Sequence, residues 1–484
     1  MTERSGASTK FHRVIGIDLG TTSCAVAVWD GSTMVLVPSS TGAALTPAVV
    51  GQNSAGQVVV GQPPIGDVDS ALTAVKRLLG TGDRIRFRGS TYLPREICAF
   101  LLIELKRQAE AFIGAPVHDA VLTVPSAAGE AQRRALREAA GLAQLNVRLL
   151  LDDPVAAAMA FGSGLATSGR VVGAGRIHTY AIYDLGGGTF DTSIVRIGPG
   201  TIDVLGTVGD SRLGGDDFDE RIVDYVLRQV RERHHVDLGQ DERIRRRIRW
   251  EAELRKRELS TADLTMLHLP LLTATVSAAV PLTRRTFEAM IEPEVQRSID
   301  HLTAAIAIAG MTYGVGAADV EQVLLTGGST RIPSIRRRLA EYFGLSLDDV
   351  RTDLDPQEVI ARGAGLIARD YEPAPLFDGP PAGLIAANLR LRAEMADPAP
   401  ETATPEPPAT GTPRSLPRLP AETPADFRPA AERARTLLTR SPAGEHVPLR
   451  AAYLALVDAV NAAAPDDRLT ELGETLIVEL DRAI

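Results

Sequence analysis

One short sequence pattern occurs twice in this chain, and it restricts the possible folds more than any other feature. Residues 14–22 read Val-Ile-Gly-Ile-Asp-Leu-Gly-Thr-Thr, and the apolar residues 25–28 follow them. This order is typical of a strand, a glycine turn and a second strand. The same order returns at residues 180–191 and continues into 192–195. Two such hairpins at this separation indicate a duplicated α/β unit, with one copy in each of two lobes that face each other across a cleft.

The sequence around the two hairpins predicts one large α/β domain. From about residue 14 to residue 370, short β-branched segments alternate with amphipathic helical patterns, which is typical of α/β layers. We expect this domain over residues 11–372. Its lobe I is expected at about 11–175 and its lobe II at about 176–372.

The composition changes sharply after this domain. Residues 373–429 contain 14 prolines mixed with Ala, Thr and Glu, which predicts an extended and largely disordered linker. Residues 430–484 carry apolar positions at helical spacing and predict two or three short helices. A segment of this length buries little surface by itself, so we expect the helical tail to dock on a partner.

Charge and cysteine content exclude several classes of protein. The net charge of −9 provides no dominant basic field for nucleic acid or for an anionic membrane, and the basic run 243–249 is interpreted as a solvated helix face. Cys24 and Cys98 are the only cysteines, too few for a disulfide framework. The N-terminal residues are polar, and no stretch approaches 18 apolar residues. We therefore expect a cytoplasmic protein that binds neither nucleic acid nor membrane.

The tips of the two hairpins suit a polyphosphate. Glycines allow backbone N–H groups to approach an anion closely, and threonine hydroxyls add further donors. Asp18 and Asp184 stand at the mouths of the tips, where they would repel phosphate unless a cation lay between. This predicts Mg²⁺ held through water, because Mg²⁺ gives up its hydration shell reluctantly. Either hairpin alone is equally well interpreted as an ordinary hairpin with an acidic turn residue.

Lysine is rare in this chain, which draws attention to the lysines that are present. Of the 52 basic residues, the lysines are Lys10, Lys76, Lys106 and Lys256. Lys76 follows the first hairpin and can place a compact ammonium on a terminal phosphate, which the wide fork of arginine fits less well. Without the other motifs, an exposed helix lysine would be the better interpretation.

At this point the motifs resemble one family, the seventy-kilodalton heat-shock (DnaK-type) chaperones. The resemblance is to their nucleotide-binding domain, an actin-like, two-lobed ATPase fold, and it runs from about residue 14 to residue 369. Besides the two hairpins, it rests on five segments in order: 121–133, 153–158, 209–219, 253–260 and 327–333.

The resemblance implies ATP and Mg²⁺ as cofactors, slow ATP hydrolysis, and a role for each matching residue. Lys76, Asp153, Asp184, Thr189 and Asp191 would act on the γ-phosphate and the attacking water, and Asp18 and Asp184 would hold the metal through water. The remaining nucleotide-binding residues implied are Gly20, Thr21, Thr22, Ser23, Gly186, Gly187, Gly188, Gly214, Gly215, Glu253, Lys256, Arg257, Ser260, Gly327, Gly328, Ser329, Arg331 and Ile332.

The chain also departs from the family pattern. Asp153 stands where the family usually has a glutamate, so the carboxylate near the attacking water is one methylene shorter. Gln357 replaces a usual aspartate near the adenine pocket. The segment from Lys76 to Pro125 is shortened by a few tens of residues, which trims the small subdomain of lobe I. Residues 373–429 lack the alternation of the family's peptide-binding β-sandwich, so no ATP-sensitive binding of short hydrophobic peptides is expected.

Four functions remain open on this basis. The first is an ATP-driven switch of chaperone type, in which a protein partner, client or co-chaperone responds to lobe closure, with the helical tail as a candidate docking segment. The second is a pseudoenzyme that binds ATP as a sensor or scaffold, which the departures at Asp153 and Gln357 favour. A small-molecule kinase shares the first hairpin but not the segments 253–260 and 327–333. An actin-like filament former would need self-complementary lobe surfaces.

Overall fold

The fold is described by a computed structural model, which covers most of the first 395 residues. It describes residues 11–53, 56–61, 71–162, 176–273, 276–374 and 385–395, together with 428, 431–434 and 453. The chain divides into two compact units, Met1–Ala396 and Asp397–Ile484. Among the helices in the described ranges, none has the length and hydropathy of a membrane span. Apart from helical backbone at 428, 431–434 and 453, the predicted tail helices lie outside the described residues.

The first large sheet is built on the first of the two repeated hairpins. Its strands are β1 (Val14–Leu19), β2 (Ser23–Trp29), β3 (Met34–Leu36), β4 (Thr46–Pro47), β9 (Asp119–Val124) and β10 (Asn146–Asp152). β1 pairs antiparallel with β2 and parallel with β9, which in turn pairs parallel with β10. The strand order is therefore β10-β9-β1-β2-β3, with β4 also paired to β2.

The second large sheet repeats this arrangement. Its strands are β11 (His178–Leu185), β12 (Phe190–Gly198), β13 (Thr201–Asp210), β16 (Gln322–Thr326) and β17 (Val350–Arg351). The order is β13-β12-β11-β16-β17, in which β11 pairs antiparallel with β12 and parallel with β16. In both sheets a meander of three strands is extended by two parallel strands on the side of its first strand. This equivalence confirms the duplicated α/β unit that the repeat predicts.

Helices cover both sheets. They are α1 (Pro94–Ile113), α2 (Glu130–Leu142), α3 (Asp153–Gly162), α4 (Gly215–His234), α5 (Glu242–Glu258), α6 (Arg284–Met290), α7 (Glu292–Tyr313), α8 (Pro333–Phe343), α9 (Val359–Ala368) and α10 (Ile385–Glu394). Short 3-10 turns are η2 (Val75–Leu78), η3 (Ala317–Asp319), η4 (Gly328–Arg331) and η5 (Leu347–Asp349). Two-stranded sheets are formed by β5 (Val50–Gln52) with β6 (Val58–Val60), β7 (Ile85–Phe87) with β8 (Ser90–Tyr92), and β14 (Leu264–Leu269) with β15 (Ala278–Thr283).

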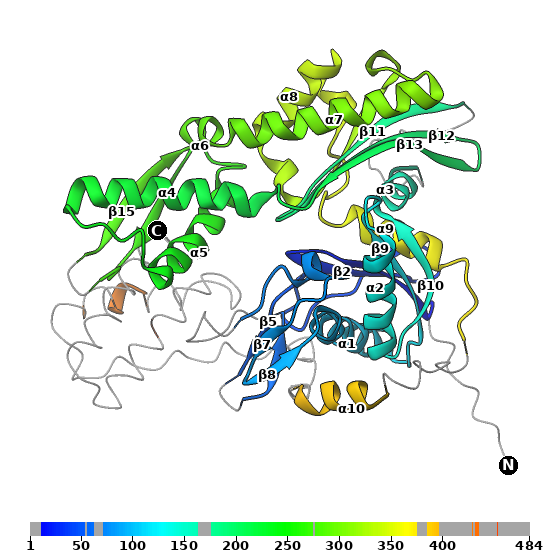
Figure 1. Ribbon diagram of the computed structural model, residues 1–484, viewed down its shortest axis with the longest axis horizontal. Coiled ribbons are helices and arrows are strands. Elements are labelled where there is room, and N and C mark those ends of the chain that lie inside the picture. The colour runs from blue at the N-terminus through cyan, green and yellow to red at the C-terminus, as the bar shows by residue number, and fades with distance from the viewer. Residues whose placement is uncertain are drawn as a thin grey trace. The chain divides into compact units, whose positions relative to one another are not determined.

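Each sheet has its own apolar core, and a third core joins them. The first sheet packs on α1 and α2, and the second packs on α4, α7 and α8. The third core contains side chains of both sheets together with those of α3 and α9, which lie between the sheets (Figure 1). The predicted boundary between the lobes, near residue 175, falls in 163–175, outside the described residues, and stays a prediction.

The helices α3 and α9 approach each other at backbone distance. A Cβ atom built on Gly363 of α9 would lie 1.8 Å from the carbonyl oxygen of Ala156 in α3. Two residues further on, the peptide of Gly365 meets β1, where a Cβ on Gly16 would lie 2.1 Å from the Gly365 nitrogen. Both helices are rich in alanine and glycine at this crossing. Small residues are therefore what permits the two sheets to be joined so closely.

Helix α10 lies within the range that the sequence assigns to a disordered linker, so that prediction is wrong for residues 385–394. Leu391 is fully buried in the core of the first sheet. Arg390 forms a 2.6 Å ion pair with Glu96 of α1, and its guanidinium lies 5.1 Å from the ring centre of Tyr92. Glu394 accepts a hydrogen bond from the Tyr92 hydroxyl. The apolar spacing of this proline-free stretch outweighs the proline-rich composition around it.

Shortening Leu391 tests whether α10 belongs to the folded lobe. Leu391→Ala is expected to lower the free energy of unfolding of the full chain by roughly 2–5 kcal/mol, because it leaves a cavity in the core. Arg392→Ala, on the exposed side of the same helix, should change it by less than about 0.5 kcal/mol. Urea denaturation followed by circular dichroism measures both. Equal stabilities of the two variants would show that α10 is not part of the core.

Candidate functional site

The tips of the two repeated hairpins meet. In the first, Leu19 and Cys24 are the last paired residues before the turn, and in the second they are Leu185 and Phe190. A Cβ atom on Gly187 would lie 1.9 Å from the hydroxyl oxygen of Thr22, so only glycine permits this contact between the two tips. The repeat therefore places two glycine-containing turns, one from each sheet, side by side.

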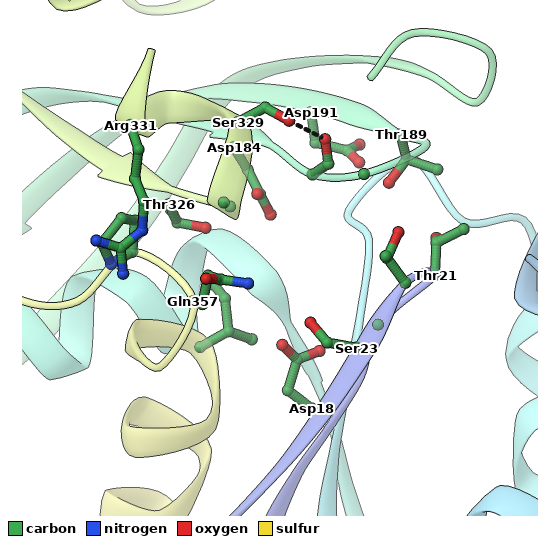
Figure 2. A pocket seen from close by; sticks show the side chains of 18 of the residues that line it. Asp18, Thr21, Ser23, Asp184, Thr189, Asp191, Thr326, Ser329, Arg331 and Gln357 are labelled. Atoms are coloured by element: carbon green, nitrogen blue, oxygen red, sulfur yellow. Dashed lines mark hydrogen bonds between the residues drawn. The ribbon is translucent and has the colours of Figure 1, made fainter. Parts of the chain in front are cut away.

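A cavity of about 340 Å³ opens between the tips, a size suited to a small molecule. Figure 2 shows Asp18, Thr21 and Ser23 on one side of it and Asp184 and Thr189 on the other. All five predicted catalytic residues line it, and so do most of the predicted nucleotide-binding residues. The lining residues from the predicted set are Asp18, Gly20, Thr21, Thr22, Ser23, Lys76, Asp153, Asp184, Gly186, Gly187, Thr189, Asp191, Glu253, Lys256, Arg257, Ser260, Gly327, Gly328, Ser329, Arg331 and Ile332.

Three predicted residues lie behind the cavity wall instead. Gly188, Gly214 and Gly215 are absent from the lining. A Cβ on Gly214 would lie 2.7 Å from the Gly188 nitrogen, and one on Gly215 would lie 2.8 Å from the Lys256 ammonium. These glycines therefore allow α4, α5 and the turn of the second hairpin, residues 186–189, to pack closely.

Four aspartates and one lysine form the polar centre of the cavity. Burial raises the pKa of Asp153 to about 7 and that of Asp184 to about 6, and Asp18 adds to both shifts. Burial, with Asp184 next, also raises the pKa of Asp191 well above its ordinary value. Burial opposes the charge of Lys76, but Asp153 and Asp18 outweigh it and raise its pKa. Lys76 is thus a buried ammonium inside a group of carboxylates that repel one another.

The wall contributed by α5 is held by one buried ion pair. Lys256 donates hydrogen bonds of 2.8 Å to the Gly215 carbonyl and to Asp219 in α4. Burial raises the pKa of Asp219 to about 6, against the opposing effect of Lys256. Arg257 is exposed and pairs with Glu253 one turn earlier in the helix. The charged side chains near the C-terminal end of α5 are therefore held at the cavity by contacts with α4 and by an ion pair within α5.

The opposite wall comes from the turn after β16. The Ser329 hydroxyl donates a 2.8 Å hydrogen bond to the Gly186 carbonyl, which ties this turn to the second hairpin (Figure 2). Arg331 pairs with Asp355 at 2.6 Å. Gln357 points into the cavity beside Gly328, where a Cβ would lie 3.1 Å from its amide carbon. The turn after β16 thus lines the cavity with a cation, an amide and glycines, whereas four aspartates and Lys76 form its polar centre.

Five lining residues were not among the predicted set: Pro125, Thr326, Pro356, Gln357 and Ile360. Thr326 is the last residue of β16, and the parallel register pairs it with Asp184. The carboxyl ends of parallel strands meet at one sheet edge, which is the usual place for a ligand site. The position of Thr326 follows from strand pairing, which no local pattern reveals.

The described residues contain no group of three or more His, Cys, Asp or Glu side chains placed to ligate a metal ion directly. Two buried side-chain oxygens of the cavity, Asp153 Oδ1 and Thr326 Oγ1, make no hydrogen bond of ordinary geometry to another described residue, although Thr326 lies close enough to Asp184 to lower the pKa of that carboxyl. Unpartnered buried oxygens in a polar cavity are expected where a ligand or water completes the site.

Comparison with known families agrees with this geometry. The sequence model of the family described as Hsp70 protein matches residues 14–85 and 82–375, which is about three quarters of the chain. The matched residues include both large sheets, both hairpin tips and every residue that lines the cavity. Proteins of this family are ATP-binding ATPases of chaperone type with an actin-like, two-lobed fold. This chain belongs to the Hsp70 family.

Proposed function

We propose that the protein is a Mg-ATP-binding, slowly hydrolysing ATPase switch that couples its nucleotide state to a protein partner. The observation that carries this proposal is the meeting of two glycine turns, one from each sheet, at one cavity that also holds Lys76. Backbone amides of such turns bind phosphate oxygens. A ligand held by both turns at once would connect the two sheets, so its loss or hydrolysis would change how the lobes are joined.

The residues divide between the two ends of the nucleotide. Thr21, Thr22, Gly186, Gly187 and Thr189 would hold the β- and γ-phosphates. The Lys76 ammonium would stabilise the charge that develops on the transferred phosphoryl group. The adenosine would lie between α5 and the turn after β16, where the planar guanidinium of Arg331 can stack on the base. The cavity has polar groups of the required kind at both ends.

Asp153 is the candidate for positioning the attacking water. It is buried, its Oδ1 makes no hydrogen bond to another described residue, and its pKa of about 7 suits a group that exchanges a proton near neutral pH. The shorter side chain of aspartate places this carboxylate further from the phosphates than a glutamate would. Slow hydrolysis is the expected consequence.

Mg²⁺ would be held through water by Asp18 and Asp184. The residues fit this ion, because burial raises the pKa of both carboxylates and their repulsion adds to the shift of Asp184, a cost that a cation relieves. Water-mediated binding also suits the lack of a direct ligand set in the described residues. When bound, the ion would neutralise charge on the β- and γ-phosphates.

A second candidate function is an ATP-binding sensor or scaffold without turnover. It is favoured by Asp153, with its shorter side chain, and by Gln357, which removes a charge from the adenosine end of the cavity. A single-turnover assay with radiolabelled ATP separates the two functions. Binding without release of phosphate over hours would favour the sensor. Partner coupling through residues 430–484, a co-chaperone and a cytoplasmic location stay predictions.

Calorimetry with ATP and magnesium tests the proposal. The wild type should show saturable binding, and Gly328→Asp should weaken it at least about a hundredfold. A Cβ at this position would lie 3.1 Å from the Gln357 amide, which must shift to admit it, and the aspartate would place a carboxylate against the nucleotide. Gly82→Asp is the matched control, because a Cβ there meets no atom within 4 Å. Absence of binding by the wild type would refute the proposal.

A further inference from the structure

The residue after Lys76 makes a different contact from Lys76 itself. Both belong to the 3-10 turn η2, but Lys76 lines the cavity and Arg77 does not. The Arg77 guanidinium donates hydrogen bonds to the carbonyl oxygen of Gly188 and, at 3.2 Å, to the Asp216 carboxylate. Gly188 belongs to the turn between β11 and β12, and Asp216 to the first turn of α4. Arg77 therefore reaches from the first sheet's side of the cavity to two elements of the second.

The second lobe is shaped to receive this guanidinium. A Cβ on Gly188 would lie 1.9 Å from Arg77 Nη2 and 2.8 Å from its Nε, so any other residue would push the guanidinium away. The two elements that it contacts are themselves joined, because the Asp216 amide donates a 2.6 Å hydrogen bond to the Gly187 carbonyl. Arg77 thus contacts the point where α4 joins the turn at residues 186–189, which is called the second phosphate turn below.

The turn that carries both basic residues is constrained. Ala74, which precedes η2, has φ of 55°, a conformation that costs energy in a residue with a side chain and persists only where the surroundings impose it. Val75 is buried on the first lobe. Because Lys76 and Arg77 are consecutive in this turn, the position of one limits the position of the other.

We propose that Arg77 is a positioning residue that couples lobe closure to the placement of Lys76. When the lobes close, its contacts with Gly188 and Asp216 hold η2 against the second phosphate turn and so fix the ammonium of Lys76 at the γ-phosphate. When they open, that restraint is lost. The inference rests on the proposed ATP hydrolysis. It implies that the Arg77–Asp216 ion pair forms when the lobes close and breaks when they open.

Stability and turnover separate positioning from a merely structural role. The side chains of Arg77 and Asp216 are 26% and 45% exposed, and pairs this accessible to water contribute little to stability. A displacement of about 1 Å in a catalytic group, by contrast, can cost about a hundredfold in rate. Loss of Arg77 should therefore affect turnover far more than unfolding.

The test compares Arg77→Ala, Arg77→Lys and Asp216→Asn in the full chain. We expect Arg77→Ala to lower kcat for ATP hydrolysis about 10- to 100-fold with less than about a threefold change in the Kd for Mg-ATP. Arg77→Lys should recover part of the loss, since one ammonium can reach one acceptor. The effects of Arg77→Ala and Asp216→Asn on kcat should not add. Arg84→Ala, an exposed arginine of the same lobe, is the control.

The distance between the two lobes can be measured by fluorescence energy transfer, and this measurement does not depend on ATP hydrolysis. Donor and acceptor dyes on Thr91→Cys and Glu232→Cys, both exposed, would report it, since the native Cys24 and Cys98 are buried. Arg77→Ala should lower the ATP-closed fraction. Unchanged closure, or a loss of kcat fully explained by a lower melting temperature, overturns the inference. Failure of the wild type to bind ATP overturns the proposed function instead.

Discussion

Lys76→Ala is expected to lower the rate of ATP hydrolysis at least about a hundredfold while the protein still binds Mg-ATP. Lys76 is 8% exposed, and its ammonium interacts with the carboxylates of Asp153 and Asp18, which raise its pKa and keep it charged at neutral pH. Its position beside the phosphate turns stabilises charge that grows only as the phosphoryl group is transferred. Single-turnover phosphate release and calorimetric titration with ATP measure the two quantities separately.

Lys106→Ala is the matched control for this prediction. Lys106 is also a buried lysine of the first lobe, but it does not line the cavity, and it donates a 2.8 Å hydrogen bond to the Gln144 carbonyl. Its loss should lower stability and leave the turnover number unchanged. If Lys76→Ala hydrolysed ATP as fast as the wild type, the role given to Lys76 would be wrong.

The second large predicted effect is a loss of folding stability when a side chain is added where α3 and α9 cross. Gly363→Ala is expected to lower the free energy of unfolding by about 3 kcal/mol. The added methyl would lie 1.8 Å from the Ala156 carbonyl oxygen, so the two helices must separate and loosen the core between the sheets. The higher helix propensity of alanine would return about 1 kcal/mol, and the steric cost is larger. Urea denaturation of the full chain measures the difference.

Gly82→Ala controls for the general effect of replacing glycine. A Cβ at residue 82 meets no atom within 4 Å and its φ is not positive, so this variant should be as stable as the wild type or slightly more stable. Wild-type stability of Gly363→Ala would mean that α3 and α9 can move apart at no cost, and that their crossing does not hold the lobes.

The fold was predictable to the extent that it depends on the repeated hairpin. Both copies of the pattern occupy equivalent places in the two sheets, as the order β3-β2-β1-β9-β10 and the order β13-β12-β11-β16-β17 show. The pattern contains its own turn glycines and buried strands, so local sequence is sufficient to identify it. Helix α10, residues 385–394, is a proline-free stretch inside a proline-rich range, so the average composition of that range does not reveal it.

The sequence predicted the site residues that belong to a local motif. It did not predict those that reach the cavity through strand pairing or through contacts between the two sheets. Lys76 and the glycine turns lie at the cavity as their motifs predict. Thr326 reaches it because β16 pairs with β11, and Arg77 reaches Gly188 because the two sheets face each other. Thr326 directly precedes the segment 327–333, but that segment does not mark it as a cavity residue, and Arg77 is one of many arginines in the chain. Long-range contacts of this kind require the three-dimensional structure.

The burial of the lysines has a practical consequence for chemical labelling. Lys76, Lys106 and Lys256 are 8%, 4% and 9% exposed, and Lys10 lies outside the described residues. Amine-reactive reagents and enzymes that acylate lysine therefore find no accessible lysine within the described residues. An ATP analogue with a reactive acyl phosphate would deliver its acyl group to an amine beside the bound nucleotide. Lys76 and Lys256 are the lysines among the described residues that line the cavity, so modified peptides containing them would report occupancy of the nucleotide site.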